Sequence, residues 1–148
     1  MGRLVLSATG WVYADASMVL YSTNNHPVYA ALSDLLWEVQ SSRFTVSSEL
    51  TLLETLVSPL REGDAALATD REALWRQPNT RLLPISQSIL REAAQLRADI
   101  PGLKTPDAIH AATAFYHGCA LFVTNDKGFQ RIPNLPIVLL DKVLAAPQ

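Results

Sequence analysis

The amino-acid sequence predicts an α/β fold in which helices cover both faces of a mainly parallel sheet. Short apolar runs of strand length, such as residues 119–124 and 137–140, alternate with segments of helical spacing. These runs are apolar throughout, which is typical of strands that are buried on both faces of a parallel sheet. Four acidic residues also stand at the ends of such runs or at helix starts, near the edge where a parallel sheet holds its ligands.

Length and composition predict one domain that spans residues 1–148. Of the 148 residues, 49% are hydrophobic and 18% are charged, which is enough for one well-buried core. The single cysteine, Cys119, cannot close an internal disulfide, and this fits a reducing cytoplasm. No run approaches the roughly 18 consecutive apolar residues of a membrane span, and residues 1–10 have too little apolar length for a secretory signal. We therefore expect a cytoplasmic protein with no membrane partner.

The first predicted unit is a strand followed by a helix. Residues 11–15 form a short run of β-favouring side chains that ends at Asp15, and a polar break follows at residues 22–25. Residues 27–40 have the apolar spacing of one face of an amphipathic helix. That face consists of Val28, Leu32, Leu35, Leu36 and Val39.

The second predicted strand covers residues 43–46 and leads into two helices. Ser47 or Ser48 is a suitable N-cap for a helix that continues to Leu60. After a glycine, residues 64–75 are alanine-rich and charged, which favours another helix.

The next predicted strand is short and lies at an edge of the sheet. It covers residues 82–85, and Pro84 within it favours an edge because proline cannot donate a ladder hydrogen bond. Residues 86–97 return to helical spacing. A further helix begins at Thr105, with a proline at its first helical position, and continues to about His117. The strands at residues 119–124 and 137–140 complete the predicted order, and no internal repeat or linker divides the chain.

The residues most suited to chemistry are four carboxylates spread over nearly the whole chain. Magnesium and manganese take oxygen ligands, usually a few carboxylates together with substrate phosphate. Short connections after the strands of a parallel sheet bring such residues to one rim. The predicted metal-binding and catalytic residues are Asp15, Glu54, Asp107 and Asp126.

Each of these acids also has a structural interpretation when it is taken alone. Asp107 is suited to complement a helix dipole, and Thr51 with Glu54 matches a capping box. Asp126 fits an ordinary turn, and Asp15 could cap the segment after it. Only their joint placement favours a metal site.

Several neighbouring residues are weaker candidates. We expect Ser17, Thr124 and Asn125 to support the site at most, by hydrogen bonds to a carboxylate, a bound water or phosphate. His110 is interpreted as a partly buried helix residue and not as a catalytic one. Glu49 is expected to face solvent, since it lies five residues before Glu54 and points away from it on a helix.

The charge balance gives no global attraction to nucleic acid. The 12 lysines and arginines are outnumbered by 14 acids, for a net charge of −2. If four acids converge on metal ions, however, the remaining surface has a basic excess, and contact with phosphate remains electrostatically feasible. The basic residues along the middle of the chain are Arg43, Arg61, Arg71, Arg76, Arg81, Arg91, Arg97 and Lys104.

Several of these segments resemble the motifs of the PIN-domain nucleases. Val12–Ser17 resembles their opening strand, and Ser47–Glu54 resembles their second acidic segment. The most specific likeness is Thr105–Ala114 followed by Leu121–Phe129, which is similar to the C-terminal signature of VapC-type toxins. The resemblance covers about residues 11–141.

The resemblance implies a three-layer α/β/α fold and a ribonuclease that depends on Mg²⁺ or Mn²⁺. It further implies an RNA substrate, a small antitoxin protein as a partner, and a homodimer. The acidic residues of the family map onto Asp15, Glu54, Asp107 and Asp126. Ala16 departs from the pattern, because many members have threonine there, but no carboxylate is lost.

Two other functions are compatible with parts of the pattern. The first is a catalytically inactive PIN-like scaffold that binds RNA or protein, although a scaffold has no need for four converging carboxylates. The second is phosphoryl transfer through an aspartyl phosphate at Asp15. Phosphatases of that kind carry a second aspartate two residues later, where this chain has Ser17, and Lys127 alone is weak support for a receiver domain.

Overall fold

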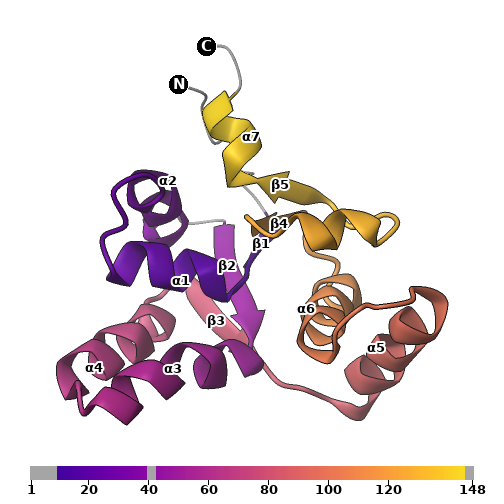
Figure 1. Ribbon diagram of the computed structural model, residues 1–148, viewed down its shortest axis with the longest axis horizontal. Coiled ribbons are helices and arrows are strands. Elements are labelled where there is room, and N and C mark those ends of the chain that lie inside the picture. The colour runs from indigo at the N-terminus through magenta and orange to yellow at the C-terminus, as the bar shows by residue number, and fades with distance from the viewer. Residues whose placement is uncertain (1–9, 40–42, 146–148) are drawn as a thin grey trace.

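The computed structural model describes residues 10–39 and 43–145, and its centre is a five-stranded parallel sheet (Figure 1). The strand order is β3-β2-β1-β4-β5, and every neighbouring pair is parallel. The strands are β1 (Gly10–Ala14), β2 (Arg43–Ser48), β3 (Thr80–Leu83), β4 (Leu121–Thr124) and β5 (Ile137–Leu139).

Helices cover both faces of this sheet, so the predicted three-layer α/β/α fold is confirmed (Figure 1). One face packs against α5 and α6, and the other against α1, α2 and α7, while α3 and α4 form a pair beside α1. The helices are α1 (Ala16–Thr23), α2 (Ala30–Ser33), α3 (Leu50–Glu62), α4 (Ala65–Ala73), α5 (Gln87–Asp99), α6 (Thr105–Tyr116) and α7 (Leu140–Ala145). Short 3₁₀ turns lie at Asp34–Trp37, Leu74–Arg76 and Lys127–Arg131.

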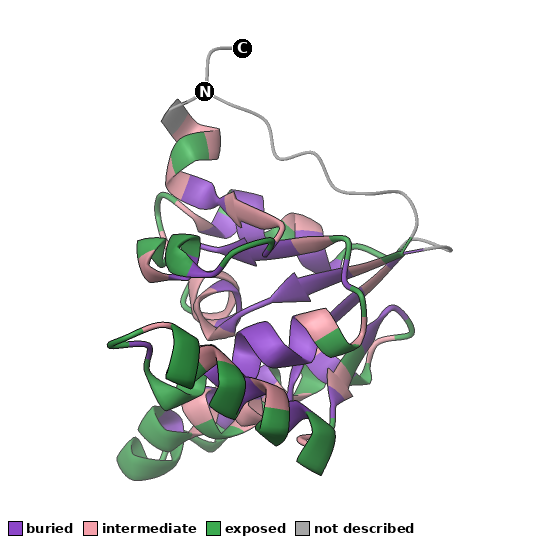
Figure 2. Cartoon of the chain, turned by 90° about the vertical axis from the view of Figure 1, so that its right-hand side faces the viewer, coloured by how far each residue is buried: buried purple, intermediate pink, exposed green. Residues whose placement is uncertain are grey.

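The two cores follow from the alternation of side chains along the strands. Tyr13 and Phe122 belong to the core under α5 and α6, whereas their neighbours Val12 and Val123 belong to the core under α1 and α7. All four are fully buried, and the rings of Tyr13 and Phe122 stack with centroids 4.8 Å apart. Buried residues gather on the strands in the middle of the molecule, and exposed residues gather on the outer helices (Figure 2).

The first connection, between β1 and β2, differs most from the sequence prediction. The helix predicted for residues 27–40 is reduced to α2 and a 3₁₀ turn; Glu38 is extended, and residue 40 lies outside the described residues. The backbone oxygens of Leu35 and Glu38 accept from the Arg43 guanidinium instead of continuing a helix. The predicted break at residues 22–25 is the end of α1, a helix that the sequence analysis did not predict.

The later elements agree with the sequence prediction more closely. β3 is an edge strand, as predicted from Pro84, although it begins and ends two residues earlier than expected. The run at residues 137–140 is divided between β5 and α7, and α7 was not predicted. Among the described residues, no helix is long and apolar enough to cross a membrane.

Candidate functional site

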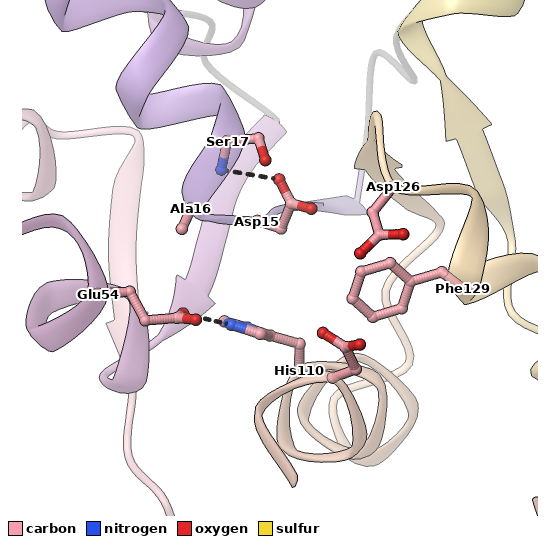
Figure 3. Close-up of a pocket in the computed structure, with 8 residues that line it drawn as sticks. Asp15, Ala16, Ser17, Glu54, His110, Asp126 and Phe129 are labelled. Carbon is pink, nitrogen blue, oxygen red and sulfur yellow. Dashed lines mark hydrogen bonds and ion pairs between the residues drawn. The ribbon is translucent and has the colours of Figure 1, made fainter. Parts of the chain in front are cut away.

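The four predicted acids surround one pocket at the carboxyl ends of β1 and β4 (Figure 3). They come from four separate places in the chain: the end of β1, the helix α3, the first turn of α6, and the turn after β4. The residues that line the pocket are Asp15, Ala16, Ser17, Glu54, Asp107, His110, Asp126 and Phe129. None of these lining residues is a lysine or arginine.

Asp15 is the most deeply buried of the four acids, with 5% of its surface exposed. It caps α1, because its Oδ1 accepts from the Ser17 N–H at 3.1 Å, and its Oδ2 accepts from the Thr124 hydroxyl at 2.5 Å. Burial raises the pKa of Asp15 to about 6, and the charge of Asp126 adds to this rise. The Thr124 hydrogen bond and His110 oppose it. Asp15 therefore both caps α1 and lines the pocket.

Asp126 follows β4 and faces Asp15 across the pocket (Figure 3). Its Oδ1 accepts from the Gly128 N–H at 2.8 Å, so the turn interpretation also holds for this residue. Its own N–H donates to the Thr124 hydroxyl oxygen at 3.0 Å. The Thr124 hydroxyl therefore contacts the carboxylate of Asp15 and the backbone N–H of Asp126.

Asp107 lies in the first turn of α6, where an acid is favourable to the helix dipole. Burial raises its pKa, and the nearby charge of Asp126 raises it further. His110 and Lys104 act in the opposite direction. The charge of Asp126 thus acts on both Asp15 and Asp107.

Glu54 lies on α3, and its carboxylate points toward His110 on α6 (Figure 3). Nε2 of His110 is 2.6 Å from Oε1 of Glu54. Glu54 is not the partner of Thr51 in a capping box, because the Thr51 hydroxyl bonds that of Ser47 at 2.6 Å. Glu49 is exposed, as predicted.

The three predicted supporting residues have different environments. Thr124 is buried and bonds Asp15 directly, and Ser17 lines the pocket and contributes its backbone N–H. The side chain of Asn125 points elsewhere: it donates to the Tyr21 hydroxyl at 3.3 Å and accepts from the Asp141 N–H at 3.0 Å. The structure thus places Asn125 in a contact with α1 and α7.

The pocket has the chemistry and the room for a hydrated divalent cation. Its donors are carboxylate oxygens, the ligands that hard cations prefer. Its volume of about 150 Å³ accommodates several water molecules, at roughly 30 Å³ each. In residues 10–39 and 43–145, no three acidic, histidine or cysteine side chains are close enough to share one ion. Magnesium does not require such a cluster, because one or two carboxylates, water and substrate phosphate usually complete its shell.

Comparison with known families and structures identifies the fold. The sequence profile of the PIN domain matches residues 12–135. The chain belongs to the PIN domain family. The resemblance inferred from the sequence is therefore confirmed, and its motifs lie around the pocket. Comparison with curated proteins returned no match.

Solved structures of VapBC and toxin–antitoxin proteins share this PIN fold. VapBC2 from Rickettsia felis, bound to a promoter DNA fragment, matches with a TM-score of 0.70 and 18% identity over 87% of this chain and 98% of that one. A toxin–antitoxin complex from Klebsiella pneumoniae matches with a TM-score of 0.64 and 25% identity, over 86% of this chain and 95% of that one. VapC20 from Mycobacterium tuberculosis is described as a toxin that cleaves the sarcin-ricin loop. It matches with a TM-score of 0.67 and 18% identity, over 82% of this chain and 95% of that one.

Two residues of this PIN domain have a closer relation to the pocket than the sequence analysis expected. His110 was expected to be partly buried; it is 3% exposed, lines the pocket and contacts Glu54. Its position three residues after Asp107, on one side of α6, was the available signal. Tyr13 contacts His110 from the buried side of β1, and its place within an apolar strand gave no signal of this role.

Proposed function

We propose that this PIN domain is an endoribonuclease that depends on Mg²⁺ or Mn²⁺ and hydrolyses RNA phosphodiester bonds. The observation that carries the proposal is the convergence of four carboxylates, from four separate elements, on one pocket. The carboxylates in question are Asp15, Glu54, Asp107 and Asp126. Membership of the PIN domain family supports the same activity.

The carboxylates would hold the cation and orient the reacting phosphate. A bound divalent cation supplies a hydroxide nucleophile near neutral pH and neutralises charge on the phosphate. Asp15 is preorganised for this role, because Thr124 and the Ser17 N–H fix both of its oxygens. Asp126 is held by the Gly128 N–H through one oxygen, and no hydrogen bond from the described residues occupies the other.

The proposal includes the role of toxin in a toxin–antitoxin pair, with a small antitoxin protein as a partner and a homodimeric state. The Klebsiella pneumoniae structure, which is 25% identical, is a toxin–antitoxin complex and supports the toxin role and the antitoxin partner. Apolar side chains that face solvent on α3 are available for protein contacts; they are Leu53, Val57 and Leu60. Light scattering of the purified protein would measure its mass and test the homodimer.

The alternative function is a catalytically inactive scaffold that binds RNA or protein. The spread of the acidic side chains favours it, because no three of them within the described ranges are close enough to share an ion. The alternative predicts that neither Mg²⁺ nor Mn²⁺ binds, whereas the nuclease proposal predicts binding.

Cleavage of a mixed pool of structured RNA by the purified protein tests the nuclease proposal. We expect cleavage with Mg²⁺ or Mn²⁺ and none with EDTA. Asp126→Asn should abolish cleavage while the protein stays folded, since the amide keeps the oxygen that accepts from Gly128. Full activity of this variant would overturn the assignment. Absence of both metal binding and cleavage would favour the scaffold.

A further inference from the structure

A chain of hydrogen bonds runs from the buried sheet to the rim of the acidic pocket. The Ser48 N–H donates to the Tyr13 phenol oxygen at 3.1 Å, and this phenol group lies 2.5 Å from Nδ1 of His110. The other ring nitrogen, Nε2, lies 2.6 Å from Oε1 of Glu54 (Figure 3). We call these four residues the Tyr13–His110 chain. It connects the ends of β1 and β2 with α6 and α3.

Most of this chain is shielded from water. Ser48 and Tyr13 are fully buried and His110 is 3% exposed, whereas the Glu54 side chain is 29% exposed at the pocket. A buried polar group without a matched partner destabilises the fold, so each donor in the chain must meet an acceptor. This requirement determines where the protons lie.

The phenol group of Tyr13 determines which atom donates in its hydrogen bond with Nδ1 of His110. A phenol is protonated at neutral pH, and the full burial of Tyr13 disfavours its charged form further. The Ser48 N–H occupies one lone pair of the phenol oxygen. The Ser47 side chain also hydrogen-bonds this oxygen, and Nδ1 of His110 lies 2.5 Å from it, positioned to accept the phenol proton. The ring must therefore present a lone pair at Nδ1.

The carboxylate of Glu54, at the other end of the Tyr13–His110 chain, favours the same tautomer of His110. A neutral imidazole that accepts at Nδ1 carries its proton on Nε2. That N–H then donates to Oε1 of Glu54. The opposite tautomer would place a lone pair of Nε2 against a lone pair of Oε1 of Glu54 at 2.6 Å.

We propose that Tyr13 and His110 are positioning residues, which hold the Glu54 carboxylate at the pocket by keeping His110 in its Nε2-protonated tautomer. Groups that hydrogen-bond a ligand residue from outside commonly fix its orientation in this way. Glu54 has a long, flexible side chain on the surface of α3, so an unsupported carboxylate would sample several rotamers. The effect on cation binding rests on the proposed function, whereas the order of hydrogen bonds does not.

The placement of His110 on α6 links this support to a second acid. Asp107 and His110 are three residues apart, so they lie on one side of the helix, and both line the pocket. One helix thus presents one carboxylate and the residue that positions another. A shift of α6 would move both together.

Nitrogen NMR of histidine in the metal-free, full-length protein tests the tautomer directly. The chain has three histidines, and loss of a signal in His110→Gln assigns the relevant ring. We expect a pyridine-type Nδ1 and a pyrrole-type Nε2 at neutral pH, and a mixture of tautomers in Tyr13→Phe. A ring protonated at Nδ1, or at both nitrogens, in the unmodified protein would overturn the proposal.

A matched pair of substitutions tests the positioning. The amide nitrogen of glutamine reaches the place of Nε2, whereas that of asparagine reaches only the place of Nδ1. His110→Gln should therefore keep Mn²⁺ affinity within about threefold, and His110→Asn should weaken it by roughly 10- to 100-fold. Equal losses in the two variants, or no loss in His110→Asn, would contradict positioning.

The two experiments separate this proposal from the proposed function. If the unmodified protein neither binds Mn²⁺ nor cleaves RNA, the nuclease assignment fails, and the NMR experiment alone decides the Tyr13–His110 chain. If the protein binds Mn²⁺ and cleaves RNA but shows the wrong tautomer, the positioning proposal fails and the nuclease assignment stands.

Discussion

Arg71 and the acidic pocket are two places where this chain buries charge, and the surroundings of the two charges are opposite. Arg71 on α4 is 3% exposed, and its guanidinium donates to three neutral oxygens at 2.9–3.0 Å, those of Thr23, Asn24 and Thr55. Asp15 is 5% exposed, but it faces other carboxylates across a pocket whose lining includes no lysine or arginine.

The difference separates a charge whose partners the fold supplies from a charge that a neighbouring carboxylate disfavours. The fold itself supplies the acceptors for Arg71, so this residue ties α1 and α3 to α4 without any external group. In the pocket, burial raises the pKa of Asp15 and of Asp107, and the charge of Asp126 raises both further. A cation from outside the protein would relieve that repulsion. The two sites should therefore respond differently to mutation.

The largest expected effect is on catalysis in the pocket. Asp107→Asn removes one carboxylate without changing its shape, and we expect RNA cleavage to fall by about 100- to 1,000-fold. The melting temperature should not fall, because burial and the charge of Asp126 both disfavour the Asp107 carboxylate. Cleavage rates and thermal melts should be compared with those of Asp70→Asn, an exposed aspartate on α4. A similar loss of activity in both variants would contradict a specific role for the pocket.

The next largest effect should be on stability at Arg71. Arg71→Met removes a buried charge and three hydrogen bonds, and we expect the free energy of unfolding to fall by about 3 kcal/mol. Arg76→Met is the control, since the Arg76 side chain is 73% exposed and should change stability by less than about 0.5 kcal/mol. Denaturant unfolding measures both. Equal stability of the two variants would show that the Arg71 contacts do not support the fold.

A smaller effect is expected where the backbone supports the pocket. A Cβ atom at position 128 would lie 3.0 Å from Oδ1 of Asp126, closer than such contacts normally come. Gly128→Ala should displace this carboxylate and weaken Mn²⁺ binding by about tenfold, a typical cost of disturbing a group that orients a ligand. Calorimetric titration measures the affinity. Unchanged affinity would mean that Asp126 does not need its present orientation.

The smallest expected effect concerns Cys119, which lies away from both charged sites. Burial raises the pKa of its thiol to about 12, so the thiol stays protonated and unreactive at neutral pH. We expect no alkylation of the folded protein at pH 8 and rapid alkylation after denaturation, measured by mass spectrometry. Rapid labelling of the native protein would show that this part of the core opens readily.

The strands and the acidic residues could be predicted from the sequence because their signals are local. Apolar runs marked β4 and β5, short runs of strand-like residues marked β1 and β2, and Pro84 marked β3 as an edge. Asp15 and Asp126 follow strands, and Asp107 lies in the first turn of α6, where parallel topology brings them to one rim; Glu54 lies one turn further into α3. Their roles in metal binding and catalysis remain predictions.

The remaining features depend on contacts between segments that are distant in sequence. The helix predicted for residues 27–40 is cut short where Arg43 and Thr45 take the backbone oxygens that a longer helix would use. Similarly, the role of His110 depends on Tyr13, which is 97 residues away, and on Glu54, which is 56 residues away. Periodicity within a short window carries no information on such partners.

Calorimetric titration of the purified protein with Mn²⁺ tests most directly whether the acidic pocket is completed by a cation. We expect saturable binding to the unmodified protein and to Asp70→Asn, and binding that is lost or strongly weakened in Asp126→Asn. No binding to the unmodified protein, or equal affinity in Asp126→Asn, would contradict the assignment of the pocket as a metal site.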